Sequence, residues 1–147
     1  MGFAMRINFV DVICDDSLKN IYVNGKKNGF DFDIRLSYYR GHYLSCIDEF
    51  KVRVDGEELA DEDVTFCLNR KEFNVNQFPY LISEFWQLLE PAHIKVYKRG
   101  GLSVGEHDIK VHLMLRVPYM PLSAAAEDTK YMPLDSCGEK VLCIKEN

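Results

Sequence analysis

The four histidines of this chain, His42, His93, His107 and His112, are its first candidates for metal chemistry. His107 and His112 are the closest pair, five positions apart in a stretch that alternates apolar and polar residues. Successive side chains of a β-strand point to opposite faces, so this odd separation puts the two rings on opposite faces. They cannot chelate one ion together, because the ligands of a metal site must converge. We therefore expect structural or surface roles for all four histidines and no metal site in this chain.

The five cysteines are candidates for nucleophilic or redox chemistry. They are widely spread and lack the Cys-x-x-Cys spacing that is typical of zinc sites: Cys14, Cys46, Cys67, Cys137 and Cys143. The N-terminal residues lack the unbroken apolar run of a secretory signal. We therefore expect reduced thiols in a cytoplasmic protein. A reactive thiol would need a lowered pKa, so an independent thiol enzyme is the least favoured interpretation.

Two further groups could resemble a catalytic or binding site. Asp31 and Asp33 share the polar face of one expected strand, as a general acid–base pair could, although exposed strand faces are commonly charged. Residues 100–107 resemble a phosphate-binding loop, but such loops precede a helix, and here a strand-like alternation follows. We interpret this loop as a hairpin connection with structural roles for four residues: Gly100, Gly101, Gly105 and His107. We predict no catalytic residue in this chain.

The densest cluster of contact-forming residues is Tyr38-Tyr39-Arg40-Gly41-His42-Tyr43. Tyrosine and arginine are enriched at the centres of protein interfaces, because they combine a large contact area with hydrogen bonding. They also suit stacking on a sugar or a polyphenol. The alternative is local packing, with a core tyrosine beside a surface arginine. Both interpretations remain open, and the density of the cluster favours an interface.

The cluster follows a strand with one apolar and one polar face. Phe30, Phe32, Ile34 and Leu36 alternate with Asp31, Asp33, Arg35 and Ser37. Before it, Asn-Gly pairs predict a hairpin loop over residues 24–29. Further strands are expected at residues 50–54, 64–68, 94–97 and 108–117, with Pro118 and Pro121 stopping the pairing of the last one or placing it at a sheet edge. Residues 76–83 predict a short helix bent at Pro79, followed by a strand-like piece with Trp86.

This pattern predicts an all-β fold, an antiparallel β-sandwich with one or two short helices. We expect a single domain over residues 1–147, with an N-terminal arm or strand at 1–20 and a loosely held C-terminal arm at 123–147, whose last strand lies near residues 140–144. The net charge of −5 argues against a nucleic-acid partner. The sequence shows no membrane-spanning segment, so we expect no membrane partner.

Several blocks of the sequence resemble a known family. The most specific are Tyr38-Tyr39-Arg40-Gly41 and Gly100-Gly101-Leu102-x-x-Gly105-Glu106-His107, within a resemblance that runs from about Gly29 to Pro121. The chain resembles the small β subunit of bacterial C-glycoside deglycosidases. The N-terminal region and the cysteine-bearing tail lie outside the resemblance.

The resemblance implies a partner and a reaction. The partner is a large catalytic α subunit, a xylose-isomerase-like barrel that holds a divalent metal, expected to be manganese, while this chain holds no cofactor. The complex cleaves the carbon–carbon bond between a 3-oxo sugar and an aromatic aglycone such as a flavonoid. The oxidised C3 acidifies the C2 proton, so base-assisted elimination expels the aglycone. The metal and the base belong to the α subunit.

The resemblance also implies which residues face the partner. They are Tyr38, Tyr39, Arg40, Gly41 and His42, with Arg35 in support. The small subunit would then stabilise the catalytic barrel. A free-standing carbohydrate-binding or polyphenol-binding module is the alternative function.

Overall fold

Two antiparallel sheets make up most of the computed structural model, which describes residues 5–6, 10–38, 40–121 and 131–145. In spatial order, the first sheet contains β1 (Lys19–Val23), β2 (Lys26–Ile34), β9 (Ala92–Tyr97), β6 (Val64–Leu68) and β7 (Lys71–Asn74). The second contains β11 (Tyr131–Asp135), β10 (Gly105–Pro121), β4 (Ile47–Val54) and β5 (Glu57–Glu58), and β12 (Gly138–Ile144) also pairs with β10. The predicted all-β sandwich is confirmed.

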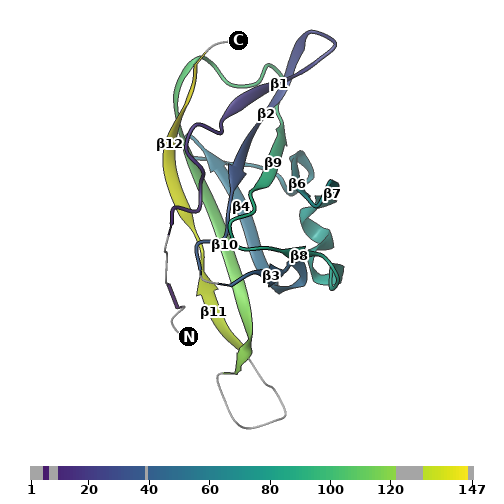
Figure 1. The fold of residues 1–147 in the computed structure, drawn as a ribbon. Helices are drawn as coiled ribbons and strands as arrows, with labels where there is room; N and C mark the ends of the chain where they lie inside the picture. The colour runs from purple at the N-terminus through teal and green to yellow at the C-terminus, as the bar shows by residue number, and fades with distance from the viewer. Residues whose placement is uncertain (1–4, 7–9, 39, 122–130, 146–147) are drawn as a thin grey trace.

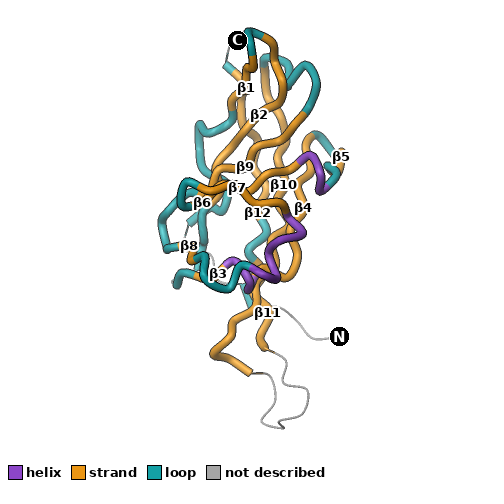
Figure 2. Tube along the Cα trace, turned by 90° about the vertical axis from the view of Figure 1, so that its right-hand side faces the viewer, coloured by secondary structure: helices purple, strands orange, loops and turns teal. Residues whose placement is uncertain are grey.

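A two-stranded ribbon and three short 3-10 helices complete the fold. The ribbon pairs β3 (His42–Tyr43) with β8 (Phe85–Trp86). The helices are η1 (Leu44–Cys46), η2 (Asp61–Asp63) and η3 (Val75–Tyr80). The ribbon and η3 lie on the same flank of the sandwich as β6 and β7, on the right in Figure 1, and this flank faces the viewer in Figure 2. Within the described residues, no helix is long and apolar enough to span a membrane.

The strand before the aromatic cluster forms the centre of the core, as its alternation predicts. The side chains of Phe30, Phe32, Ile34 and Leu36 are all 0% exposed. Because the two sheets stack face to face, the apolar face of β2 is buried between them. The hairpin before it is tighter than expected. Asn24 and Gly25 (φ 53° and 79°) form the turn, and the strand already begins at Lys26.

The longest strand, β10, lies inside its sheet. It pairs with β4 on one side and with β11 and β12 on the other, so the expectation of an edge position is wrong. The alternative expectation is that the prolines interrupt the pairing of this strand. The register with β11 does shift between Val117 and Pro121. A proline cannot donate a ladder hydrogen bond, which accounts for this interruption.

The described segments near both ends of the chain pack against the sandwich. Instead of a loosely held arm, residues 131–144 supply β11 and β12, because Leu134, Leu142 and Ile144 are buried in the core. The final strand is longer than the expected residues 140–144. At the other end, Met5 bridges Leu134 and Ile13 bridges Ile34.

The loop at Gly100 and Gly101 is a connection between the two sheets. It links β9, in the first sheet, to β10, in the second, so the expected hairpin connection is wrong. A strand does follow the loop, as the alternation predicts. The predicted helix at residues 76–83 is the shorter η3, with Pro79 inside it, and the strand-like piece with Trp86 is β8.

Candidate functional site

The β3–β8 ribbon carries the aromatic cluster and has two distinct faces. His42 pairs with Trp86, and both side chains are buried. Tyr43 pairs with Phe85 on the outward face, where the two rings meet edge to face with centroids 4.9 Å apart. The Trp86 indole N–H donates a hydrogen bond of 2.7 Å to the Glu90 carbonyl. The ribbon thus has an inner side in the core and an aromatic outer side.

The structure distributes the predicted partner-facing residues between core and surface. Tyr38 is 3% exposed and lies beside His42, with ring centroids 6.2 Å apart, which favours local packing for that side chain. Arg40 is exposed, whereas Tyr39 lies outside the described residues. Arg35 donates from Nε to the Asp11 carbonyl at 2.8 Å. That this segment contacts a partner stays a prediction.

Gly41 is required by a close approach within the ribbon. A Cβ atom at this position would lie 2.6 Å from the Phe85 ring and 2.7 Å from the Trp86 carbonyl oxygen. Real Cβ atoms do not approach other atoms this closely, so a larger residue would separate the strands. This explains the glycine of the Tyr-Tyr-Arg-Gly block by packing.

His42 is a buried polar group at the base of this ribbon. Within the described residues, neither of its ring nitrogens has a hydrogen-bond partner. Burial lowers the pKa of His42 below its ordinary value, and the nearby backbone of Arg40 opposes this only in part. The imidazole is therefore neutral at physiological pH. A buried polar group without a partner is destabilising, because it has lost its hydrogen bonds to water.

The ribbon and the chain next to it expose apolar side chains, most of which lie outside the aromatic cluster that the sequence singles out. We define the apolar flank as the six exposed residues of β3, β8 and the neighbouring segments: Tyr43, Tyr80, Ile82, Phe85, Leu88 and Leu89. In the sequence, the apolar residues between positions 72 and 91 follow neither a clean period of two nor a clean helical period. That missing period was the available signal, since an apolar run with no period cannot bury all of its members on one face.

Polar contacts fix the apolar flank to the sandwich. The Glu84 carboxylate accepts a hydrogen bond of 2.7 Å from Lys71, and the Asn69 side chain donates to the Phe85 carbonyl at 3.3 Å. The backbone N–H groups of Leu44 and Ser45 donate to the carbonyls of Glu84 and Leu81. The segment is therefore held on both sides.

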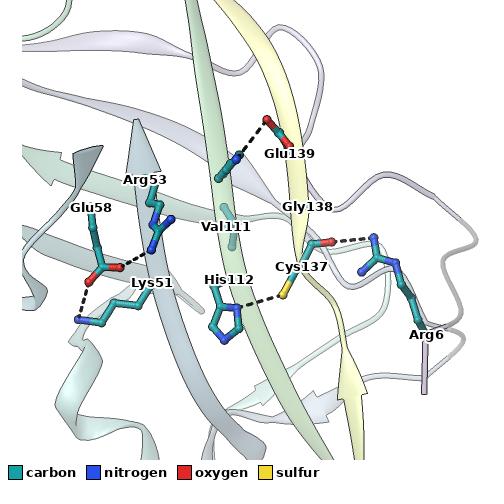
Figure 3. Close-up of a pocket in the computed structure, with 10 residues that line it drawn as sticks. Arg6, Lys51, Arg53, Glu58, Val111, His112, Cys137, Gly138 and Glu139 are labelled. Carbon is teal, nitrogen blue, oxygen red and sulfur yellow. Dashed lines mark hydrogen bonds and ion pairs between the residues drawn. The ribbon is translucent and has the colours of Figure 1, made fainter. Parts of the chain in front are cut away.

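A second candidate site is a hollow of about 620 Å³ on the outer face of the second sheet. Figure 3 shows its charged side chains, most of which point toward a partner of opposite charge. Arg53 pairs with Glu58 at 3.2 Å, and Lys110 pairs with Glu139 at 3.7 Å. Arg6 reaches across to the Cys137 carbonyl at 3.0 Å.

This hollow brings together a thiol and an imidazole that lie far apart in the sequence. The Cys137 Sγ is 3.4 Å from Nδ1 of His112, whose Nε2 is 2.6 Å from the Glu49 carboxylate. The order resembles a nucleophile, a base and an orienting acid. However, burial and the Asp135 carboxylate raise the pKa of Cys137 to about 11. The thiol is protonated at neutral pH, so this arrangement is not an activated nucleophile.

His107 lies on the opposite face of β10 from His112, as their spacing predicts, and it joins two loops. Nδ1 is 2.7 Å from the Asp55 carboxylate and Nε2 is 2.8 Å from the Ser103 carbonyl. Burial lowers the pKa of His107, but the bonds to Asp55 and Ser103 outweigh it and leave the pKa raised. The glycines of the same loop all have positive φ: Gly100 (82°), Gly101 (60°) and Gly105 (124°).

Asp31 and Asp33 have different environments on the polar face of β2. Asp33 contacts Nδ1 of His93. Burial raises the pKa of Asp31, although Lys19 opposes the shift. Among the residues that the structure describes, no group of three or more His, Cys, Asp or Glu side chains could hold a metal ion. The expected lack of a metal site in this chain stays a prediction.

Comparison with known proteins identifies the family. A family model described as the C-glycoside deglycosidase beta subunit matches residues 9–119. The chain belongs to this family. A C-glycoside deglycosidase beta subunit from Eubacterium cellulosolvens is 34% identical over 116 residues, which cover 75% of this chain and 79% of that protein. A 3'-dehydrocarminate deglycosidase beta subunit from a Microbacterium species is 30% identical over 126 residues, covering 82% and 91%.

The C-glycoside deglycosidase beta-subunit match includes the ribbon and the apolar flank. It ends at residue 119, within β10, so β11 and β12 lie beyond it. A further beta subunit of this family, from Microbacterium trichothecenolyticum, is 27% identical over 113 residues, covering 75% of this chain and 80% of that protein. The resemblance inferred from the sequence blocks is confirmed at the level of the family.

Proposed function

We propose that this chain is the small, non-catalytic β subunit of a heteromeric C-glycoside deglycosidase. The observation that carries the proposal is the family match over residues 9–119, which takes in most of the sandwich. The relatives are named as beta subunits, and this name implies an alpha subunit as their partner. We infer that a large α subunit is the partner of this chain as well.

The proposed reaction cleaves the carbon–carbon bond that joins a 3-oxo sugar to an aromatic aglycone such as a flavonoid. The name of one relative specifies a 3'-dehydro compound, which supports a substrate that is oxidised at C3 of the sugar. Oxidation at C3 acidifies the neighbouring C2 proton, so its removal by a base leads to elimination of the aglycone. We place the base and a divalent metal, expected to be manganese, on an α subunit with a xylose-isomerase-like barrel.

The chemistry of the described side chains favours a non-catalytic role for this chain. The most catalytic-looking arrangement contains a Cys137 thiol whose pKa is raised to about 11, which is the wrong direction for a nucleophile. The other histidine–carboxylate contacts lie on separate surfaces, as at His107–Asp55 and His93–Asp33. The chain would therefore act by stabilising and shaping its partner.

Co-expression with the α subunit tests this proposal. We expect the isolated chain to be inactive and the co-purified complex to cleave a 3-oxo-C-glucoside, as followed by release of the aglycone in chromatography. We expect the α subunit alone to be weakly active and less stable than the complex. Full activity of the α subunit alone, with no change on adding this chain, would contradict the proposal.

A free-standing binding module is the alternative, and the exposed rings of Tyr43, Tyr80 and Phe85 are the features that favour it. It predicts that the purified chain binds a sugar or flavonoid glycoside in calorimetry and remains monomeric without a partner. Binding of the glycoside by the complex but not by the isolated chain would exclude it.

A further inference from the structure

We propose that the apolar flank is the surface through which this chain binds its larger subunit, with Leu89 as a central contact. The proposal rests on the proposed function and specifies which part of the sandwich the partner covers. The occupant it commits to is an apolar surface of the α subunit.

The first observation is the exposure of large apolar side chains on one short stretch. Tyr80, Ile82 and Leu89 are 81%, 74% and 67% exposed. Single exposed apolar residues are common, but several on neighbouring segments indicate an interaction site. The flank also lies entirely within the residues that match the family model.

The second observation is the backbone conformation of Leu89, whose φ is +72°. This left-handed conformation is unfavourable for leucine, because its Cβ approaches the following carbonyl oxygen. The turn around it is held by the bond from the buried Trp86 to the Glu90 carbonyl and by the Glu90 N–H, which donates to the Gln87 carbonyl at 3.2 Å. Glycine or asparagine would fit this turn better. Strained residues persist where the surrounding structure over-determines them, and they cluster at functional sites.

The third observation is that contacts within this chain already hold the flank in place. The contacts of Glu84 with Lys71 and of Asn69 with Phe85 brace the segment against the β6–β7 turn. A braced surface loses little conformational freedom on binding, so more of its contact energy appears as affinity. The ion pair of Lys71 and Glu84 also neutralises the charge beside the apolar side chains.

The composition of the flank favours a protein over a sugar. A small-ligand site is concave, with a few convergent polar groups that fix the orientation of the ligand. The flank combines aromatic rings with branched aliphatic side chains, Ile82, Leu88 and Leu89. Aliphatic side chains of this kind provide no planar face for stacking on a sugar, whereas they pack well in the core of a protein interface.

Two substitutions in this chain test the proposal, each measured against the purified α subunit. Leu89→Asn introduces a residue that adopts positive φ more readily than leucine, and it removes the apolar contact. Ile82→Asp places a charge in the proposed interface. Tyr22→Asp is the matched control, since Tyr22 is an exposed aromatic residue on the β1–β2 hairpin and lies opposite Lys27.

We expect both flank variants to weaken binding to the α subunit at least 10-fold in calorimetry and Tyr22→Asp to leave it unchanged. Thermal unfolding of the isolated chains separates binding from folding. Leu89→Asn should melt at the wild-type temperature or above it, because asparagine tolerates the turn better than leucine.

Three results would count against the proposal. If the wild-type chain binds the α subunit and both flank variants bind equally well, the docking surface is elsewhere, although the proposed function stands. If the wild-type chain does not bind the α subunit, the proposed function itself fails. If the flank variants convert a dimer of this chain to a monomer in light scattering, with unchanged affinity for the α subunit, the flank binds a second copy.

Discussion

The hollow on the second sheet and the apolar flank are two surfaces of the same chain that differ in how far they are satisfied internally. In the hollow, the basic side chains find acidic partners on neighbouring strands, as Arg53 of β4 does with Glu58 of β5 at 3.2 Å. On the flank, Tyr80 and Ile82 remain largely exposed, and Leu89 is held in a strained conformation.

This comparison favours the apolar flank over the hollow as the surface that binds a partner. A charged pair on a strand is complete without any other molecule, and water solvates what remains exposed. An exposed apolar surface stays unfavourable until another surface covers it. The charged lining and the contact between a thiol and an imidazole would have pointed to the hollow as the functional site, whereas the exposed apolar side chains and the backbone strain point to the flank.

The largest expected effect comes from removing the anchor beneath the flank. Trp86 is 0% exposed and also ties down the 87–90 turn, so Trp86→Ala should cost about 3–5 kcal/mol of stability. Urea denaturation measures the change. Trp86→Phe keeps most of the packing and should cost clearly less. Equal costs for the two variants would mean that the ring does not support the flank through packing.

A smaller effect is expected where the two strands of the ribbon approach each other. Gly41→Ala would place a Cβ atom 2.6 Å from Phe85 and 2.7 Å from the Trp86 carbonyl. Overpacking of this kind costs about 1–3 kcal/mol. Phe85→Ala in the same chain removes the contact with the ring but leaves that with the carbonyl. Thermal unfolding should therefore show partial recovery in the double variant, and full recovery would show that the ring alone requires the glycine.

The sequence predicts those features of the sandwich that do not depend on which strands pair with one another. Alternation alone locates β2 and most of β10, because a strand with one buried face must alternate in any sheet. Asn-Gly and Asp-Gly pairs likewise indicate turns at Asn24-Gly25 and Asp55-Gly56, and these four residues have positive φ in the structure. The place of each strand within its sheet depends on distant segments. The pairing of β11 and β12 with β10, and hence its interior position, did not follow from the prolines.

The candidate site was less predictable for the same reason. The aromatic block directed attention to Tyr38, which the structure buries. Tyr43 of that block is exposed, but the other five residues of the apolar flank lie at positions 80–89. Which of those residues face outward depends on the packing of η3 and β8 against the rest of the chain. The contact between Cys137 and His112 joins positions 25 residues apart, and local spacing gives no sign of it.

The pH dependence of stability tests the contacts that His107 makes with Asp55 and Ser103. The expected effect is smaller than that of Gly41→Ala. The folded-state pKa of His107 is raised, so its contribution to stability is complete below the unfolded pKa of about 6.5 and is lost as the pH rises through the folded value. The bond to the half-exposed Asp55 makes this contribution about 1 kcal/mol. Urea unfolding from pH 5.5 to 9 should show the loss in the wild-type chain. His107→Gln should lack this loss, and an equal loss in the variant would assign it to another group.

The smallest expected effect lies in the hollow, where the charges are paired but exposed. Arg53 and Glu58 are 55% and 46% exposed, so Arg53→Gln should change stability by about 0.5 kcal/mol or less. Exposed pairs gain little because water solvates the separated charges almost as well. Affinity for the α subunit should also match the wild type in calorimetry. A loss of binding comparable to that of Leu89→Asn would reverse the comparison and make the charged sheet face part of the interface.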